Sequence, residues 1–286
     1  MTEPGKSIRA HLLNLAKKEN IAFQLVIIRY FHERLLYRIS ISRYANNFFL
    51  KGGTFLYYYT REQTRPTMDI DFLGYKMVND INSVRTILRE ICLLEYSNDA
   101  VTFDGNAVSA EEITGQDEYS GVRLFVTAKL DTIQQRIQID IGFGDLVIPS
   151  PVRLNYPVLL PGSEMPVIQA YSLETVIAEK FEAMIDLSTL NSRMKDFYDV
   201  YIILTTQHID LKLLEKAIHV TFHNRSTSFT PDHALFSPSF ATDPGRVRQW
   251  KAFLIKSHLD LTLDFIDVLG VICDRLLPIW NRLPFS

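Results

Sequence analysis

The sequence predicts an α/β (α+β) fold, in which a mixed sheet with flanking helices is followed by a helical C-terminal lobe. Three patterns lead to this prediction. Short strand-like segments alternate with helical spacing of apolar residues up to about residue 100, and period-two alternation replaces them from there to 148. A proline-rich segment follows at 149–166, and helical spacing then returns. We therefore expect one lobe at 1–165 and a second at 166–286.

The first lobe begins with apolar residues at helical spacing over 7–37. FFL at 48–50 predicts a short strand that leads into a glycine pair, and TFLYYYT predicts the short helix after it. MDIDFLGY is expected to be a strand and VNDINSVRTILREICLL a helix. VRLFVTAKL and QRIQIDIGFGD alternate apolar and polar residues, as half-buried strands do.

The second lobe is expected to be mostly helical. Five prolines at 149–166 favour an extended connection before it, since proline cannot continue a helix or donate to a sheet. Residues 222–245 are rich in Ser, Thr, Pro and Asp and are expected to form the longest loop. Helices are predicted at 172–187, 194–205, 211–220, 246–257 and 259–279.

Composition limits the classes of function. The chain has 286 residues, of which 47% are hydrophobic, which is enough for a sizeable core. The net charge of −3 gives no global sign of nucleic-acid binding, so such binding would need a local basic patch. Cys92 and Cys273 stand in apolar surroundings, which favours buried reduced thiols. Without a secretory signal or an apolar run of about 20 residues, we expect a cytoplasmic protein with no membrane segment.

Two aspartates one residue apart are the first candidate site. On a strand, Asp69 and Asp71 share one face while Ile70 and Phe72 face the core. Two close carboxylates repel each other, and a divalent cation between them relieves the repulsion. Mg²⁺ is the natural guest because it prefers oxygen ligands and substrate phosphates. The same pattern also occurs in sugar transferases that bind nucleotide-sugars, and on edge strands that only carry charge.

A third carboxylate is predicted to join this pair. In RIQIDIGFGD the isoleucines form one apolar face, and Asp140 lies on the opposite face. A neighbouring strand could therefore carry Asp140 next to Asp69 and Asp71. There it would act as the base for an attacking hydroxyl, or as part of a second ligand set if two Mg²⁺ ions bind.

The glycine pair ahead of these acids is a candidate phosphate seat. Gly52 and Gly53 let the backbone approach a ligand, and the N–H groups at a helix start attract phosphate. Thr54 could add a hydroxyl, and Arg65 could pair with a phosphate. Thr67 would lie on the metal-binding face if the strand already runs through it. A plain tight turn, a surface cation and a hydroxyl at a strand start are the alternatives.

Charged residues also interrupt two apolar helix stripes in the second lobe. Lys180 falls on or beside the stripe of its helix, where a lysine is costly unless it meets an anion such as a triphosphate. Asp196 and Asp199 are three residues apart and share a helix face. With Lys195 and Arg193 they predict a buried polar network that holds Lys180 or a nucleotide. Alternatively, the network only locks helices together, Lys195 pairs with Asp199, and Lys180 extends along the surface.

The combination of FLKGGTFL, RPTMDIDF, QIDIGFGD, LETVIAEKFEAM and RMKDFYDVY resembles the AbiEii/AbiGii toxin family of the nucleotidyltransferase superfamily. The resemblance covers most of the chain. It implies a polymerase-beta-like nucleotidyltransferase core with a helical C-terminal lobe. It also implies the toxin of a bacterial toxin–antitoxin or abortive infection system, with an AbiEi-like antitoxin as a possible partner. Relatives transfer nucleotides from an NTP with Mg²⁺, and some add them to the 3′ end of tRNA.

The resemblance implies roles for individual residues. Asp69 and Asp71 would bind metal, and Thr67 would stand where some members have a catalytic serine. Lys180 would hold the triphosphate, and Asp196 or Asp199 would complete the site. The sequence departs from the common pattern in having Gly-Gly for Gly-Ser and threonine for serine at 67. The nucleotide-binding set is expected to comprise Gly52, Gly53, Thr54, Arg65 and Lys195.

The resulting hypothesis is a Mg²⁺-dependent nucleotidyltransferase that transfers NMP from an NTP, with the 3′ end of tRNA as the expected acceptor. An NTP-binding partner protein without catalytic activity, a protein-modifying nucleotidyltransferase and a sugar transferase are the alternatives. RNA contacts are expected from basic residues that meet the phosphate backbone and from two nearby aromatic side chains that stack a base. Solvated helix faces would explain many of the same charges. This set comprises Arg193, Lys195, Arg246, Arg248 and Lys251, with Tyr198 and Trp250.

Overall fold

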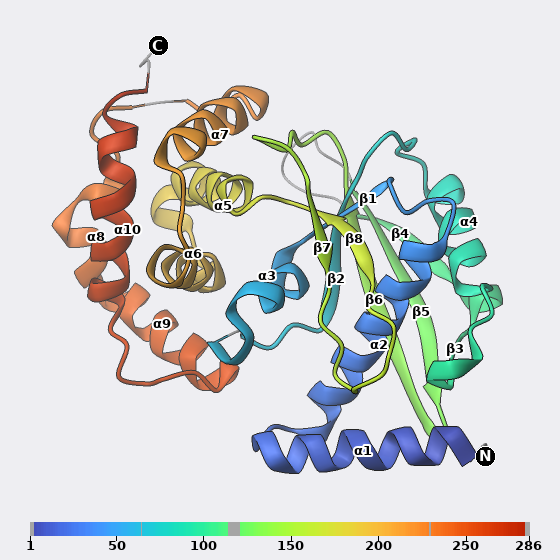
Figure 1. The fold of residues 1–286 in the computed structure, drawn as a ribbon. Coiled ribbons are helices and arrows are strands. Elements are labelled where there is room, and N and C mark those ends of the chain that lie inside the picture. The colour runs from blue at the N-terminus through green and yellow to red at the C-terminus, as the bar shows by residue number, and fades with distance from the viewer. Residues whose placement is uncertain (1–2, 64, 114–120, 229, 284–286) are drawn as a thin grey trace. The chain divides into compact units, whose positions relative to one another are not determined.

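The computed structural model of the protein describes residues 3–63, 65–113, 121–228 and 230–283 (Figure 1). The chain forms two compact units, each built from more than one segment. Unit 1 comprises Met1–Tyr58, Pro66–Gly144 and Val152–Ala170, and unit 2 comprises Tyr59–Arg65, Asp145–Pro151 and Tyr171–Ser286.

Unit 1 contains one mixed sheet with the strand order β3-β5-β6-β2-β1-β8-β7, and β4 pairs with β5. β2 pairs with β6, and β1 with β8, in parallel, whereas the other described pairs are antiparallel. The strands are β1 (Phe48–Lys51), β2 (Asp69–Gly74), β3 (Val101–Phe103), β4 (Ser109–Ile113), β5 (Gly121–Leu130), β6 (Ile133–Gly142), β7 (Val152–Asn155) and β8 (Val167–Ala170).

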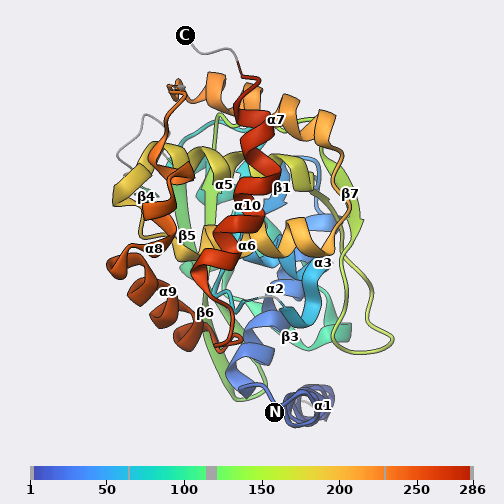
Figure 2. The same ribbon diagram turned by 90° about the vertical axis from the view of Figure 1, so that its left-hand side faces the viewer.

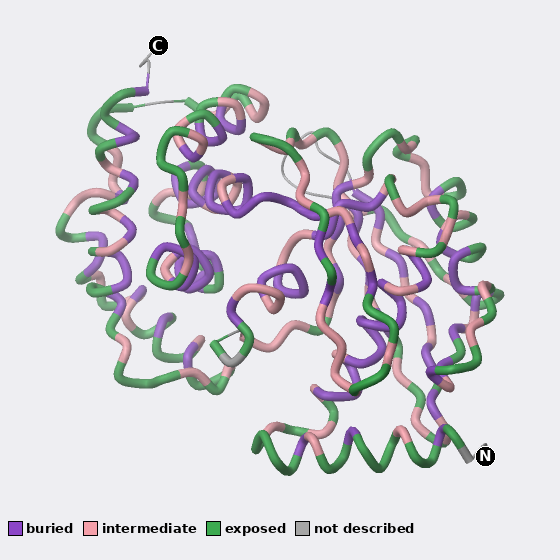
Figure 3. The backbone as a smooth tube through the Cα atoms, viewed as in Figure 1, coloured by how far each residue is buried: buried purple, intermediate pink, exposed green. Residues whose placement is uncertain are grey.

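The helices of unit 1 follow the apolar spacing of the sequence. α2 contacts β6 and β8 and is buried along most of its length, whereas α1 is largely exposed (Figure 3). α4 begins where the Asp80 carboxylate accepts a hydrogen bond from the Ser83 amide, and it packs against α2, β4 and β5. The bounds are α1 (Glu3–Glu19), α2 (Phe23–Ile41), α3 (Gly52–Thr60) and α4 (Ile81–Cys92), with short 3₁₀ turns at Ser97–Asp99 and Gly105–Ala107. The 3₁₀ turn at Arg61–Gln63, which follows α3, belongs to unit 2.

Unit 2 is helical. α5 packs against α6 and α7, and α10 packs along α6 (Figure 2). Phe181 lies at the centre of an aromatic cluster with Phe222, Phe236 and Trp280. The helices are α5 (Leu173–Leu187), α6 (Met194–Thr206), α7 (Leu211–Asn224), α8 (Pro238–Thr242), α9 (Pro244–Ser257) and α10 (Phe265–Trp280), with 3₁₀ turns at Ser188–Leu190 and Ala234–Phe236.

The α/β class and the helical C-terminal part are confirmed, but three local predictions were wrong. The proline-rich segment is not only a connection, because β7 lies within it and extends the sheet beyond β8. The last helix begins at Phe265, since the Asp260 carboxylate accepts the Thr262 amide and stabilises a turn before it. The expected loop at 222–245 contains α8, which begins at Pro238 because proline suits a first helical position.

No helix in the described part of the chain is long and apolar enough to cross a membrane.

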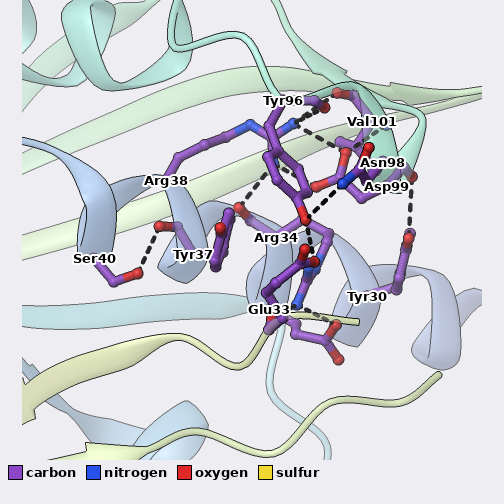
Figure 4. A network of polar contacts seen from close by, with 11 residues as sticks. Tyr30, Glu33, Arg34, Tyr37, Arg38, Ser40, Tyr96, Asn98, Asp99 and Val101 are labelled. Atoms are coloured by element: carbon purple, nitrogen blue, oxygen red, sulfur yellow. Dashed lines mark hydrogen bonds and ion pairs between the residues drawn. The ribbon is translucent and has the colours of Figure 1, made fainter. Parts of the chain in front are cut away.

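A buried ion pair connects α2 to the segment before β3 (Figure 4). Arg38 is 1% exposed and donates to both carboxylate oxygens of Asp99, at 2.5 and 3.0 Å. The Arg38 guanidinium also donates to the Val101 carbonyl at 2.9 Å, and Asp99 accepts the Val101 amide. Because both partners are buried, removal of one leaves a charge with no water to replace its partner.

We expect the Asp99→Asn variant to be less stable by about 3 kcal/mol, because Arg38 keeps its charge and loses its buried counter-ion. Urea unfolding followed by circular dichroism measures this difference. Glu90→Gln is the matched control, since the exposed pair of Glu90 with Arg43 should contribute less than about 1 kcal/mol. Equal losses in the two variants would contradict the assigned role of burial.

Candidate metal and nucleotide site

Three carboxylates meet on the sheet of unit 1. The parallel register of β2 and β6 sets Asp71 opposite Asp140, and the period of two places Asp69 on the same face as Asp71. One carboxylate oxygen from each of the three lies within 4.8 Å of the others. Ile70 and Phe72 are fully buried on the other face. The structure therefore brings together the three acids singled out in the sequence, and three oxygen donors at this spacing fit a hard divalent cation.

The glycine pair lies directly against these side chains. Gly52 has φ +68°, and a Cβ atom built there would lie 1.9 Å from Oδ2 of Asp71. A Cβ atom on Gly53 would lie 2.7 Å from Oγ1 of Thr67. Any larger residue would therefore push the Asp71 or Thr67 side chain away. The sequence predicts that a phosphate comes close to the backbone of the glycine pair. In the described residues, the Asp71 and Thr67 side chains of the same unit lie that close to it.

Hydroxyl groups hold Asp69 from two sides. Thr67 Oγ1 donates to Asp69 Oδ1 at 2.7 Å, although β2 begins only at Asp69 and Thr67 precedes the strand. Thr54 is 2% exposed, and its hydroxyl donates to the Asp69 carbonyl at 3.1 Å. Nδ1 of His32 lies 3.5 Å from Oγ1 of Thr54. Burial lowers the pKa of His32 to about 4, so this imidazole is neutral at pH 7.

Asp140 has an arginine partner that the sequence analysis missed. Arg123 Nε and Nη2 donate to Asp140 Oδ1 and Oδ2 at 2.9 and 2.8 Å, and Gln138 donates to the same carboxylate. The hydrogen bonds with Asp140 raise the pKa of Arg123. A signal for this pair was present, because counting back from the turn at 131–132 along two alternating strands sets Arg123 opposite Asp140.

The charged residues predicted on helices form a network within unit 2. Lys180 Nζ lies 2.6 Å from Asp196 Oδ1 and 2.8 Å from Asp199 Oδ2. Arg65 donates to both oxygens of Asp199 at 3.0 Å, and Arg193 Nε lies 2.7 Å from Asp196 Oδ2. Both aspartates are at most 3% exposed. The predicted buried network is thus present, and Arg65 belongs to it.

Opposite charges favour the ionised forms of Lys180 and Asp196. Burial alone would lower the pKa of Lys180, but Asp196 and Asp199 raise it above its ordinary value. Burial likewise opposes ionisation of Asp196, but Lys180 and Arg193 lower its pKa. Lys195 is exposed on α6. Asp199 forms ion pairs with Lys180 and Arg65, and not with Lys195 as the alternative prediction had it.

Comparison with known proteins identifies the family. A family model described as "Nucleotidyl transferase AbiEii toxin, Type IV TA system" matches residues 34–270. The chain belongs to this family. The resemblance seen in the sequence is thereby confirmed.

Two Helicobacter pylori crystal structures are similar to this AbiEii family member. JHP933 is 14% identical, with a TM-score of 0.48, and the match covers 87% of this chain and 89% of that one. A protein provisionally described as a nucleotidyltransferase is 15% identical, with a TM-score of 0.50, and the match covers 92% and 97%. This second similarity shows the fold alone. No curated protein matches the chain.

Part of the expected RNA-contact set serves the packing of unit 2 instead. Trp250 is 1% exposed and donates to the Leu263 carbonyl at 2.7 Å, so the prediction that it stacks a base is wrong. Tyr198 donates to the Gln63 carbonyl, and Arg246 is 9% exposed and donates to the Thr189 carbonyl. Arg248 and Lys251 are exposed.

Arg225 is a second half-buried cation that the sequence analysis missed. It donates to Asp145 and Glu182, and it also lies near Glu179. Burial alone would lower the pKa of Arg225, but Glu179, Asp145 and Glu182 raise it. Asp145 thus links the segment after β6 to the end of α7. Nothing in the sequence pattern distinguishes Arg225 from a surface arginine.

Replacement of Gly52 by alanine should destabilise the chain by about 1–3 kcal/mol, because the residue has a positive φ and its Cβ atom would meet Asp71. Urea unfolding measures the change. Gly270→Ala is the control: nothing lies within 4 Å of a Cβ atom there, and alanine favours a helix by up to about 1 kcal/mol. An equally stable Gly52→Ala variant would show that the backbone tolerates a side chain here.

Asp196→Asn should cost about 3 kcal/mol of stability at pH 7, because a buried carboxylate between Lys180 and Arg193 loses its charge. In the wild type, ionised Asp196 stabilises the fold at pH values above 3.8, the ordinary pKa of an aspartate. This contribution disappears as the pH falls through the lowered pKa of Asp196 in the native state. The difference between variant and wild type should therefore shrink in acid.

Urea unfolding at pH values from 7 down to 3 measures this difference. Asp186→Asn changes an exposed acid of the same unit and should alter stability by less than about 0.5 kcal/mol. A difference from wild type that is the same at every pH would argue against ionisation of Asp196 as the source of the effect.

Proposed function

We propose that the chain is a Mg²⁺-dependent nucleotidyltransferase that transfers NMP from an NTP to an acceptor hydroxyl, with release of pyrophosphate. The observation that carries the proposal is the meeting of the Asp69, Asp71 and Asp140 carboxylates within 4.8 Å, against a glycine turn that starts a helix. Membership of the AbiEii nucleotidyltransferase family supports it.

Asp69 and Asp71 would hold Mg²⁺, and Asp140 would be a further ligand. All three offer carboxylate oxygens, which is the donor set this ion prefers. When bound, the ion would offset the charge of the triphosphate and polarise its phosphoryl groups. A second ion is compatible with the number of oxygens, since each carboxylate has two.

The neighbouring residues orient these ligands. The Thr67 hydroxyl fixes one oxygen of Asp69, and the Thr54 hydroxyl fixes the Asp69 backbone. Arg123 donates to both oxygens of Asp140 and fixes the orientation of this carboxylate. Gly52 and Gly53 form the start of α3, and the N–H groups of a helix start attract a phosphate.

The other predicted roles remain proposals. Thr54 is proposed to contribute to nucleotide binding through its position in the glycine turn. Thr67 is proposed to take the catalytic position that a serine occupies in some relatives. Lys180, Arg65 and Lys195 are proposed nucleotide ligands, and Asp196 and Asp199 are proposed to complete the catalytic set. The ion pairs of Lys180 and Arg65 show that both cations are held in place within unit 2.

We propose an RNA acceptor, with the 3′ end of tRNA as the first candidate, and a cognate AbiEi-like antitoxin as a partner. The support for a toxin role is the family description, which names a type IV toxin–antitoxin system. Exposed Arg248 and Lys251 supply positive charge for a phosphate backbone. A protein acceptor is the second candidate, because a metal-bound NTP in the acidic site could react with a protein hydroxyl as well as with an RNA hydroxyl.

The Asp69→Asn variant should lose NMP transfer by at least about 1,000-fold, because one carboxylate of the metal site becomes a neutral amide. Purified protein is incubated with each α-³²P-labelled NTP, Mg²⁺ and total RNA, and the products are separated on a gel. Glu95→Gln, an exposed acid of the same unit, should leave the rate unchanged. Equal transfer by wild type and Asp69→Asn would exclude this site as the catalytic centre.

The same assay distinguishes the acceptors. Label in RNA of tRNA length supports the proposal, and label in protein bands would assign a protein-modifying enzyme. Release of a nucleoside diphosphate in place of pyrophosphate would indicate a sugar transferase. Saturable NTP binding without any transfer would indicate a protein that only binds nucleotide.

A further inference from the structure

Unit 1 contains a cavity of about 790 Å³ away from its acidic cluster. Its walls come from α1, from α2, from the segment at 96–99 and from the loop at 159–164. Ile8, Leu15 and Leu160 contribute apolar surface, and Arg34 and Tyr96 contribute polar groups. Other polar and charged side chains, among them His11, Asn14, Lys18 and Glu164, line the cavity as well. Apolar surface beside placed polar groups is the usual form of a small-molecule site.

Arg34 is the buried charge of this cavity. It is 0% exposed, and its Nη2 atom donates to the Glu164 carbonyl at 2.9 Å and lies 2.7 Å from Oε1 of Glu33 (Figure 4). Its Nε and Nη1 atoms are buried and have no hydrogen-bond partner among the described residues. An arginine cannot lose its proton to escape this situation, so two donors of a fixed charge stay unsatisfied.

The nearby carboxylates are engaged elsewhere. Oε2 of Glu33 accepts the Leu159 amide at 2.6 Å, and the Glu164 carboxylate contacts the Tyr96 hydroxyl. Asp99 is taken by Arg38. Burial also raises the pKa of Glu33 to about 7, so this group balances the charge of Arg34 only in part at neutral pH. Among the described residues, none of these carboxylates accepts a hydrogen bond from Nε or Nη1 of Arg34.

We propose that this cavity, the Arg34 pocket, binds a small organic anion whose oxyanion accepts hydrogen bonds from Arg34 and whose planar or apolar body lies against Leu15 and Leu160. Carboxylates and phosphate esters share this chemistry, since both present several acceptor oxygens to a guanidinium. The proposal rests on the geometry of the pocket and is independent of the proposed nucleotidyl transfer.

α2 separates the Arg34 pocket from the acidic cluster. His32 and Arg34 are two residues apart on a helix, so their side chains point to nearly opposite faces. His32 lies beside Thr54 of the glycine turn, whereas Arg34 lines the pocket. A ligand in the pocket should therefore bind without the metal site.

The test uses the full chain in EDTA, with phenyl phosphate and benzoate as probes and benzyl alcohol as the uncharged comparison, each up to about 10 mM. Ligand-observed NMR titrations measure the dissociation constants. At least one anion should bind at least tenfold more tightly than benzyl alcohol, and the better of the two assigns the pocket to phosphate esters or to carboxylates.

Arg34→Leu should weaken binding of that anion at least tenfold. Leu15→Trp fills the pocket from α1, keeps the arginine, and should weaken binding to the same extent. It therefore tests the proposed site even if Arg34→Leu does not fold. Arg43→Leu, which removes an exposed arginine of the same unit, and Asp69→Asn should bind as the wild type does. The proposal is overturned if no anion binds better than benzyl alcohol, or if Leu15→Trp binds like wild type.

Discussion

The arrangement of the acidic cluster depends on one steric constraint: the Asp71 carboxylate occupies the space where any residue other than glycine would carry its Cβ atom at position 52. The backbone turn and the side chain fit together only because Gly52 also adopts a positive φ. Gly53 likewise leaves room for the Thr67 side chain, because a Cβ atom there would collide with it. The Thr67 hydroxyl in turn donates a hydrogen bond to Asp69. The glycine pair thus sets the positions of the two acids as well as forming the start of a helix.

The sheet supplies the third acid. Parallel pairing of β2 with β6 sets Asp140 beside Asp71, and antiparallel pairing of β6 with β5 sets Arg123 on the other side of Asp140. The Arg123 guanidinium thus places a positive charge beside the three neighbouring acids. Register, a property of the backbone, therefore decides which charges meet in this family member.

The sequence predicted the members of the site better than their contacts. Period-two alternation was enough to place Asp69, Asp71 and Asp140 on polar strand faces, because a side chain's face follows from parity alone. The pairing of distant strands does not follow from parity, so the segment that contains β7 was expected only as an extended connection. Trp250 was expected at a surface because of its basic neighbours, and its burial is decided by tertiary packing that local sequence does not record.

The network of Lys180 shows both the strength and the limit of such reasoning. A lysine and two acids on apolar stripes indicated a buried polar cluster, and the structure contains it. The participation of Arg65 depends on a contact across 134 positions, which no local pattern reveals. The same burial that makes the network costly to break also gives its charges fixed positions.

The central claim is that Asp69, Asp71 and Asp140 form one site for a divalent cation. Titration of the full chain with Mn²⁺, followed by electron paramagnetic resonance of the free ion, tests this claim directly and needs no substrate. The account predicts saturable Mn²⁺ binding by the wild type, competition by Mg²⁺, and at least tenfold weaker binding by Asp71→Asn. Equal Mn²⁺ binding by wild type and Asp71→Asn would contradict it.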